Sequence, residues 1–339
     1  MKRLVVCCDG TWNKLASDCP SNVILIAQAV KPIANDGTPQ VVFYEEGLGT
    51  NWYDKLPGGA FGWGIDTNIK HAYRFLCLNY EPGDEIYFFG FSRGAYTVRS
   101  LGGLIHCSGL LSRSSICAAD TAYEIYRIRG TEQRQQAAFA FQQKHQSLRV
   151  PITLLGCWDT VCALGLPDLV SWLPFDRMVN ARYKFHDCKL SPLIQVALHA
   201  VAIDELRHIF DVTLMEQQAA SRSQILRQVW FPGGHGCVGG GTTQNRGLSD
   251  SALQWMMDEV HRAGLKLEFD ASRIQYKLVS QAASDFNNNP GWYGYLPNMI
   301  QWRQISSDAE LHDSVKQRWL KRSDYRPQNL VTHPQLVSL

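Results

Sequence analysis

Residues 85–104, EIYFFGFSRGAYTVRSLGGL, decide the fold, because a buried strand, a serine framed by glycines and a helix are predicted there in immediate succession. The β-branched and aromatic residues 86–89 predict a short strand. Residues 90–94 then match G-x-S-x-G, in which a sharp turn from strand to helix exposes the serine hydroxyl. The pattern therefore makes Ser92 a candidate nucleophile.

A serine hydroxyl is a weak nucleophile, so the prediction also requires a base and donors for an oxyanion. The Arg93 amide, directly after the nucleophile, is the first expected donor. The second should come from the loop after the first strand, where either Gly10 or Thr11 is suitably placed.

The rest of the chain alternates strand and helix patterns around this stretch. An apolar run at 3–8, a helical pattern at 21–31 and a second strand at 40–47 follow each other in β-α-β order. This order predicts an α/β fold with a doubly wound, mostly parallel sheet, as in α/β-hydrolases. Residues 118–148 predict either a helical cap or a surface pair of helices.

Four further stretches carry local predictions. Residues 57–64 are glycine-rich, but they lack the lysine of a phosphate-binding loop and are expected to be an ordinary loop. Residues 190–206 are predicted to form a helix, and residues 248–263 an amphipathic helix. Residues 161–176, rich in Leu, Trp and Phe, predict either core packing or a loop anchor, or else a lid or acyl-chain groove.

Two polar residues end predicted strands downstream of the serine. Asp159 ends an apolar run that begins after Pro151, and His235 follows the strand that begins at Arg227. The chain order Ser92, Asp159, His235 is that of α/β-hydrolases, so we predict these residues as nucleophile, acid and base.

Two other acids compete for a role near this site. Asp204 is the second candidate for the triad acid, although it precedes the histidine strand less directly. Asp9, in the loop after the first strand, either positions that loop or caps its turn.

Composition narrows the class of protein. The net charge is +2, from 33 Lys and Arg and 31 Asp and Glu, so nothing favours a nucleic-acid partner. The apolar run behind Lys2 and Arg3 is too short for a signal peptide, and no run has the length of a membrane span. We therefore expect a soluble protein made in the cytoplasm.

Cysteine spacing favours neither disulfides nor a metal. The ten cysteines include no C-x-x-C pair, so most are expected to be reduced and buried. We expect no metal and no cofactor. The chain is predicted to form one domain over 1–339, with a core at about 3–265 and a C-terminal extension at 266–339 that packs on it.

Several separated blocks also resemble a known family: CDGTWN, GFSRGAYTVRSLGGLI, GCWDTVCALGLP, AVAIDELRHIF and WFPGGHGCVGGG. They are similar to the α/β-hydrolase family called Domain of Unknown Function 2235, which includes bacterial lipase effectors of type VI secretion systems. The resemblance runs from residue 3 to about 260. This chain differs from the family directly after the histidine. The family usually has H-S-D-V-G-G there, and this chain has Gly236 and Cys237 in place of the Ser and Asp.

The resemblance implies a serine hydrolase with Ser92, Asp159 and His235 as its triad, and phospholipase activity in the secreted members. It further implies an acyl ester or phospholipid substrate, a membrane surface, and an immunity protein or secretion spike protein as partners after delivery to a target cell. Two alternatives remain: a cytosolic carboxylesterase or thioesterase on a soluble acyl substrate, and a binding or scaffold protein that keeps the fold without turnover.

Overall fold

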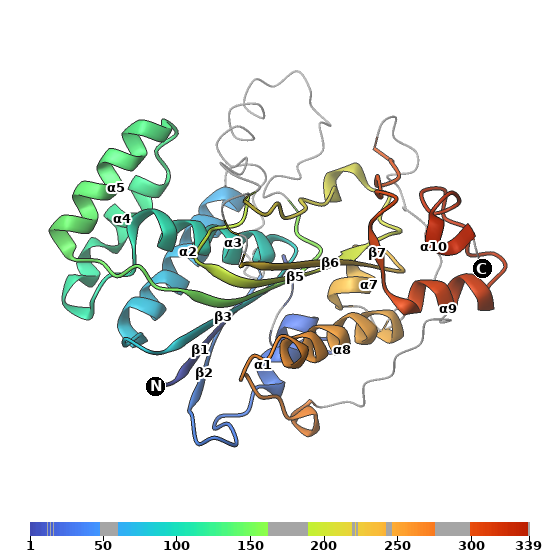
Figure 1. Ribbon diagram of the computed structural model, residues 1–339, viewed down its shortest axis with the longest axis horizontal. Helices are drawn as coiled ribbons and strands as arrows, with labels where there is room; N and C mark the ends of the chain where they lie inside the picture. Colours follow the sequence, from blue (N-terminus) through green and yellow to red (C-terminus); the bar gives the residue numbers. More distant parts are fainter. Residues whose placement is uncertain are drawn as a thin grey trace.

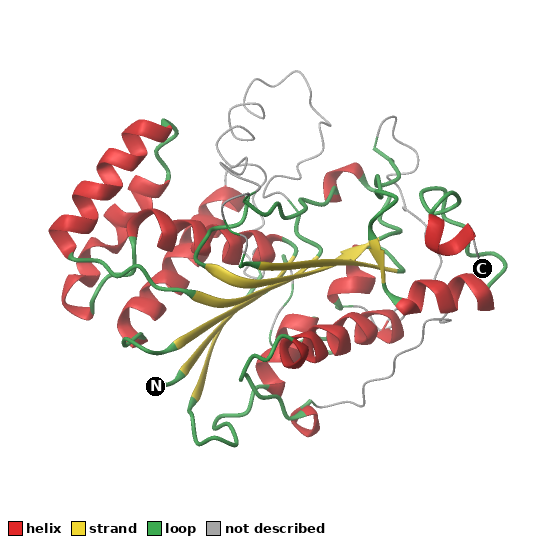
Figure 2. Ribbon diagram, in the orientation of Figure 1, coloured by secondary structure: helices red, strands yellow, loops and turns green. Residues whose placement is uncertain are grey.

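The computed structural model describes residues 1–11, 13, 15, 17–47, 60–161, 189–218, 221, 223–241, 246–274 and 299–337. Within these residues, seven strands form one sheet in the order β2-β1-β3-β4-β5-β6-β7, and every pairing is parallel (Figures 1 and 2). The strands are β1 (Arg3–Cys8), β2 (Gln40–Glu45), β3 (Glu85–Phe91), β4 (Ile152–Trp158), β5 (Ile194–Ala202), β6 (Ile225–Phe231) and β7 (Glu310–Leu311).

Helices cover both faces of this sheet, as Figure 1 shows. One face carries α1 (Asn22–Ala29), α7 (His235–Gly239) and α8 (Arg246–Arg262), and the other carries α2 (Ala60–Asn79) and α3 (Arg93–Ser108). The central strands are therefore buried on both sides, which explains why β1 and β3 are apolar without alternation. The predicted α/β fold with a doubly wound parallel sheet is confirmed.

The helical region after α3 forms a surface pair. The helices α4 (Ala119–Tyr126) and α5 (Thr131–His145) pack against each other and against α3, and α4 also contacts α2. They extend the helical layer on that face of the sheet. This arrangement corresponds to the surface pair that was one of the two predicted alternatives.

The predicted helix at 190–206 is wrong, because Ile194–Ala202 is the strand β5. This run is apolar at nearly every position, so its periodicity does not separate a helix from a doubly buried strand. Its pairing with β4 and β6 on its two edges decides the conformation. The predicted loop at 57–64 is also wrong from Ala60 onward, where α2 begins.

The glycines at the start of α2 lower the stability of the helix, and packing further along the helix offsets this cost. Ile65, Ile69, Ala72 and Tyr73 are buried against the sheet. Tertiary burial of an amphipathic face stabilises a helix more than the weak propensity of a few residues destabilises it.

The C-terminal segment 299–337 adds to the far edge of the sheet. Its strand β7 pairs with β6, and the segment continues into α9 (Asp313–Lys321) and α10 (Pro334–Val337). A third apolar cluster joins it to the sheet through buried residues that include Val201, Trp230, Leu311 and Leu330. In the described part of the chain no helix is long and apolar enough to cross a membrane.

The strand order reverses direction between β1 and β3, which lie side by side although α1, β2 and α2 separate them in the chain. In open α/β sheets, ligands bind at the carboxyl ends of the strands at such a switch point. The loop after β1 and the serine turn after β3 both lie there.

The backbone is packed so closely at this point that two glycines are required. A Cβ atom on Gly90 would lie 2.6 Å from the Gly94 carbonyl oxygen, and one on Gly94 would lie 2.1 Å from the Cys8 carbonyl oxygen. The atoms in the way belong to the backbone and cannot rotate aside. The glycines of G-x-S-x-G therefore let α3 start directly against β1 and β3.

We expect Gly94→Ala to lower the free energy of unfolding by about 3 kcal/mol or more, because overpacking against rigid backbone is not relieved by a rotamer change. Gly102→Ala in the same helix is the matched control, since its new Cβ would lie 3.5 Å from an Ile152 methyl group. There the change should stay within about 1 kcal/mol, aided by the higher helix propensity of alanine. Urea unfolding measures both, and equal losses would contradict the packing argument.

Candidate active site

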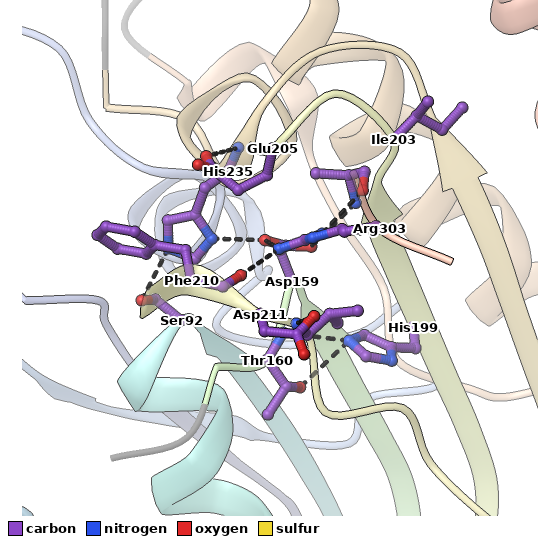
Figure 3. Close-up of polar contacts among 12 residues, drawn as sticks. Ser92, Asp159, Thr160, His199, Ile203, Glu205, Phe210, Asp211, His235 and Arg303 are labelled. Carbon is purple, nitrogen blue, oxygen red and sulfur yellow. Dashed lines mark hydrogen bonds and ion pairs between the residues drawn. The ribbon is translucent and has the colours of Figure 1, made fainter. Parts of the chain in front are cut away.

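Ser92 lies in the strained turn between β3 and α3. Its φ of 56° and ψ of −122° fall in a region that side chains with a Cβ rarely adopt. The carbonyl of Ser92 accepts a hydrogen bond from the Tyr96 amide, so the residue is the N-cap of α3. The turn projects the hydroxyl away from the helix, toward His235 (Figure 3).

His235 begins the short helix α7, four residues after β6 ends. Its Nε2 lies 2.8 Å from the Ser92 Oγ, and its Nδ1 lies 2.5 Å from the Asp159 Oδ2. The rings of Phe91 and Phe210 pack against the imidazole, at 4.7 and 4.9 Å between ring centroids. These contacts fix the plane of the ring between its two polar partners.

Asp159 follows β4 and is fully buried, with φ at 40°. Its Oδ1 accepts the Ala202 amide at 2.9 Å, while Oδ2 faces His235. Burial by itself would raise the pKa of this carboxyl, but the charge of Arg303 and the hydrogen bond from His235 hold the pKa well below its usual range. The carboxylate is therefore ionised and accepts from the Nδ1–H of His235, an arrangement in which the Nε2 of a neutral imidazole is left to accept from the serine.

Arg303 was not predicted from the sequence. It is 5% exposed and forms two bonds to Asp159, from Nη1 to Oδ1 at 2.6 Å and from Nη2 to Oδ2 at 2.9 Å (Figure 3). It lies 144 residues beyond its partner. A single arginine in the polar stretch QWRQ has no motif or spacing that would signal this contact.

Asp204, the other candidate acid, faces a different set of partners. Its Oδ2 accepts the Gly233 amide at 2.6 Å, and the Tyr325 hydroxyl donates to it at 3.0 Å. Burial raises the pKa of Asp204 to about 6 despite these hydrogen bonds. The side chain thus supports the backbone two residues before His235, whereas Asp159 contacts the imidazole itself.

The neighbouring Glu205 also supports the histidine turn. Its carboxylate accepts the His235 amide at 3.1 Å and forms an ion pair with Arg207 at 2.7 Å. The Arg207 guanidinium in turn lies 4.0 Å from the centroid of the Phe210 ring. Both members of the acidic pair 204–205 therefore hold the segment that carries His235.

Asp9 ties the loop after β1 to two other elements. Its carboxylate accepts the Ser21 hydroxyl at 2.6 Å and the Tyr44 hydroxyl at 2.9 Å, and it also accepts the Gly10 amide at 2.7 Å. Burial raises the pKa of Asp9 to about 6. These bonds join the loop after β1 to Ser21, the N-cap of α1, and to Tyr44 in β2, while positioning of this loop by Asp9 stays one of its two predicted roles.

This loop lies against the serine turn. A Cβ atom on Gly10 would be 3.1 Å from the Ser92 Cβ, so the two backbones are in contact. The Gly10 amide is already bonded to Asp9. The other residue predicted to supply the second oxyanion donor is Thr11, whose buried hydroxyl has no hydrogen-bond partner among the described residues.

A second histidine near the acid has a different environment. His199 is fully buried in β5, where its Nε2 accepts the Thr160 amide at 3.1 Å (Figure 3). Its Nδ1 lies 3.1 Å from the Gln228 Oε1. Burial lowers its pKa to about 4, so it is a neutral packing residue at ordinary pH.

A cleft of about 360 Å³ opens beside the histidine turn and Arg303. Its walls are mainly polar: Glu205, Arg207, His208, Asp211, Gln301 and Gln304. The predicted lid or acyl-chain groove at 161–176 lies outside the described residues beyond Val161. Among the residues that are described, no three His, Cys, Asp or Glu side chains are grouped to hold a metal ion.

The raised pKa of Asp204 predicts a specific pH dependence of stability. Between about pH 4 and pH 6 the folded protein keeps a proton on Asp204 that the unfolded chain has lost, so this contribution to stability declines as the pH rises through that window. Asp204→Asn should therefore reduce the loss of unfolding free energy between pH 4 and pH 7 by about 2 kcal/mol. Asp9→Asn should have the same effect, and an unchanged pH dependence in both variants would refute the assignment.

Comparison with known proteins gives both characterised and uncharacterised relatives. The uncharacterised yeast protein YEL023C from Saccharomyces cerevisiae is 28% identical over 232 residues, which cover 62% of this chain and 32% of the relative. An uncharacterised protein from Pseudomonas aeruginosa has a similar solved structure, with a TM-score of 0.48, 18% identity, and coverage of 83% of this chain and 49% of the other.

The Tle1 effector, solved bound to the VgrG spike of the type VI secretion system, has a TM-score of 0.39 and 17% identity, with coverage of 71% and 51% of the two chains. The chain thus spans about a third of the yeast relative and about half of each solved protein. The sequence model of the type VI secretion phospholipase effector Tle1-like catalytic domain matches residues 2–259. The chain belongs to this family of Tle1-like phospholipase effector catalytic domains.

Proposed function

We propose that this chain is a serine hydrolase that cleaves carboxylic esters of phospholipids. The observation that carries the proposal is the continuous line of hydrogen bonds from the Ser92 hydroxyl through His235 to Asp159. A hydroxyl on a strained turn, an imidazole within hydrogen-bond reach of it and an ionised acid behind the imidazole are the three groups that acyl transfer through a serine requires. Membership of a phospholipase effector family supports the choice of substrate.

In the proposed reaction, Ser92 Oγ attacks the ester carbonyl while His235 Nε2 takes the hydroxyl proton. The tetrahedral intermediate collapses by breaking the bond to the alcohol, and the imidazolium returns the proton to that leaving group. Water then attacks the acyl-enzyme with His235 again as base, releasing the fatty acid and restoring the serine. Asp159 stabilises the imidazolium in both halves.

The oxyanion formed in each half needs donors at the switch point. We assign these to the amides of Arg93, at the N-terminus of α3, and Thr11, in the loop that lies against Ser92. The positive end of the α3 dipole adds to this stabilisation.

Family membership also supports delivery through a type VI secretion system. The Tle1 effector is bound to a VgrG spike, and as part of the proposal we expect this chain also to have a spike partner, and an immunity protein in the producing cell.

The organisation of the chain as a single domain stays a prediction.

Ser92→Ala should reduce ester hydrolysis at least about a thousandfold and abolish labelling by a serine-directed phosphonate, because only binding and oxyanion stabilisation would remain. Thermal unfolding should change little. If purified wild type neither labels nor hydrolyses any acyl ester, the scaffold alternative replaces this proposal.

Substrate class is tested by comparing fatty-acid release from phospholipid vesicles with hydrolysis of short soluble esters. We expect higher kcat/KM on vesicles. Activity confined to soluble esters would instead favour the carboxylesterase alternative.

Asp159→Asn should lower kcat about 10³- to 10⁴-fold, since an amide favours the wrong imidazole tautomer. Asp204→Asn should cost far less, because that side chain bonds the Gly233 amide and not the imidazole. The reverse ranking would assign the acid role to Asp204.

A further inference from the structure

Arg303 belongs to a part of the chain that the family match does not include. The match ends at residue 259, whereas Arg303 lies in the C-terminal segment 299–337. Its guanidinium nevertheless reaches the carboxylate of Asp159 and covers both of its oxygens. A fork of two parallel N–H bonds fixes the plane of a carboxylate, which a single charge does not.

The guanidinium is itself held from several sides. Nη1 also donates to the Ala202 carbonyl at 2.7 Å, and Nη2 to the Phe210 carbonyl at 2.5 Å. The Asn329 side chain joins the Arg303 carbonyl, at 3.2 Å, to the Ile203 carbonyl, at 3.1 Å. Arg303 is therefore part of a hydrogen-bond network that links the end of β5, the segment around Phe210 and the C-terminal segment.

Each oxygen of the Asp159 carboxylate accepts hydrogen bonds from two donors. Asp159 Oδ2 accepts from both His235 and Arg303, while Oδ1 accepts from Arg303 and Ala202. An isolated carboxylate at this depth would be strongly destabilised, and a proton on it would remove its use as an acceptor for the imidazole.

We propose that Arg303 is a positioning residue of the catalytic site, which keeps Asp159 ionised and orients its carboxylate toward His235. This inference rests on the proposed function of the triad. It makes the segment 299–337 a working part of the active site and not only a cover for the sheet edge.

The inference has a signature in pH. Without the charge of Arg303 the pKa of the buried Asp159 carboxyl should rise, so the ionised acid, and activity with it, should be lost at a higher pH. The other charged or titratable groups near this pair, which the Arg303 variants leave unchanged in sequence, are Glu205 and Asp204 from the turn after β5, Asp211 beyond Phe210, and His199 within β5.

The test compares Arg303→Gln, Arg303→Lys and a matched control, Arg318→Gln. Arg318 is a second buried arginine of the same segment, 1% exposed, and it packs over the Tyr325 ring. The readout is the pH profile of kcat/KM on a phospholipid or soluble ester, whichever the wild type hydrolyses.

Arg303→Gln should lower kcat/KM at least tenfold and move the acid limb of the profile upward by about one pH unit. Arg303→Lys should keep the limb near the wild-type position, because the charge remains, while kcat falls through loss of the fork. Arg318→Gln should lower thermal stability without moving the limb. If Arg303→Gln lowers kcat/KM but leaves the acid limb of the pH profile in place, Arg303 has only a structural role and the proposal is overturned.

Should Arg303→Gln fail to fold, the double variant Asp159→Asn/Arg303→Gln removes both buried charges together. Compared with Asp159→Asn alone, it should lose less than about twofold in kcat, since Arg303 acts through the acid. A further loss of tenfold or more would refute that route.

One measurement separates this inference from the proposed function. The low-field proton NMR signal of the hydrogen bond between His235 Nδ1 and Asp159 Oδ2, assigned by its loss in His235→Gln, needs no turnover. Loss or an upfield shift of this signal in Arg303→Gln supports the role of Arg303 even if the wild type hydrolyses no ester. An unchanged signal overturns it even if the wild type is active.

Discussion

The buried negative charge of Asp159 is the constraint on which the rest of the site depends. A carboxylate at the end of a central parallel strand is removed from water, and its ionised form persists only if opposite charge and hydrogen bonds compensate it. Here compensation comes from Arg303, the Ala202 amide and His235. Segments from the middle and the end of the chain must therefore meet at this one side chain before the histidine can be oriented.

Three buried acids near the site show how partners decide ionisation. Asp9 and Asp204 accept hydrogen bonds from hydroxyl and amide donors, and burial raises the pKa of each to about 6. Asp159 is equally buried, but its direct partners include a guanidinium, and its pKa is held well below the usual range. The first two hold the loops that carry Gly10 and His235, while the third contacts the imidazole. Burial alone would have made all three similar.

Topology brings these groups together from distant positions. The Ser92 hydroxyl and the His235 ring are 143 residues apart in the chain, yet both follow parallel strands whose carboxyl ends share one edge of the sheet. The reversal of strand order at β1 and β3 opens that edge, and close glycine packing brings the loop after β1 against the serine. The site is thus a consequence of the winding of the sheet, with loops supplying the chemistry.

The sequence by itself determined the features that are encoded locally. The serine turn, the alternation of strands and helices, and the polar residues at the strand ends each depend on a short run of neighbours. Ser92, Asp159 and His235 could therefore be predicted as one group, and their side chains are in hydrogen-bond contact in the structure. The strand β5 could not, because a run that is apolar throughout has no diagnostic period until its partners on both edges are known.

Only the tertiary structure decided the remaining choices. In the structure the Asp204 carboxylate accepts the backbone amide of Gly233, the Gly10 amide donates to Asp9, and Arg303 forms an ion pair with Asp159. Each of these is a contact between groups remote in the chain or a competition between nearby acceptors. A sequence pattern records the residues but not the distances, and the energy of a buried charge depends on distances.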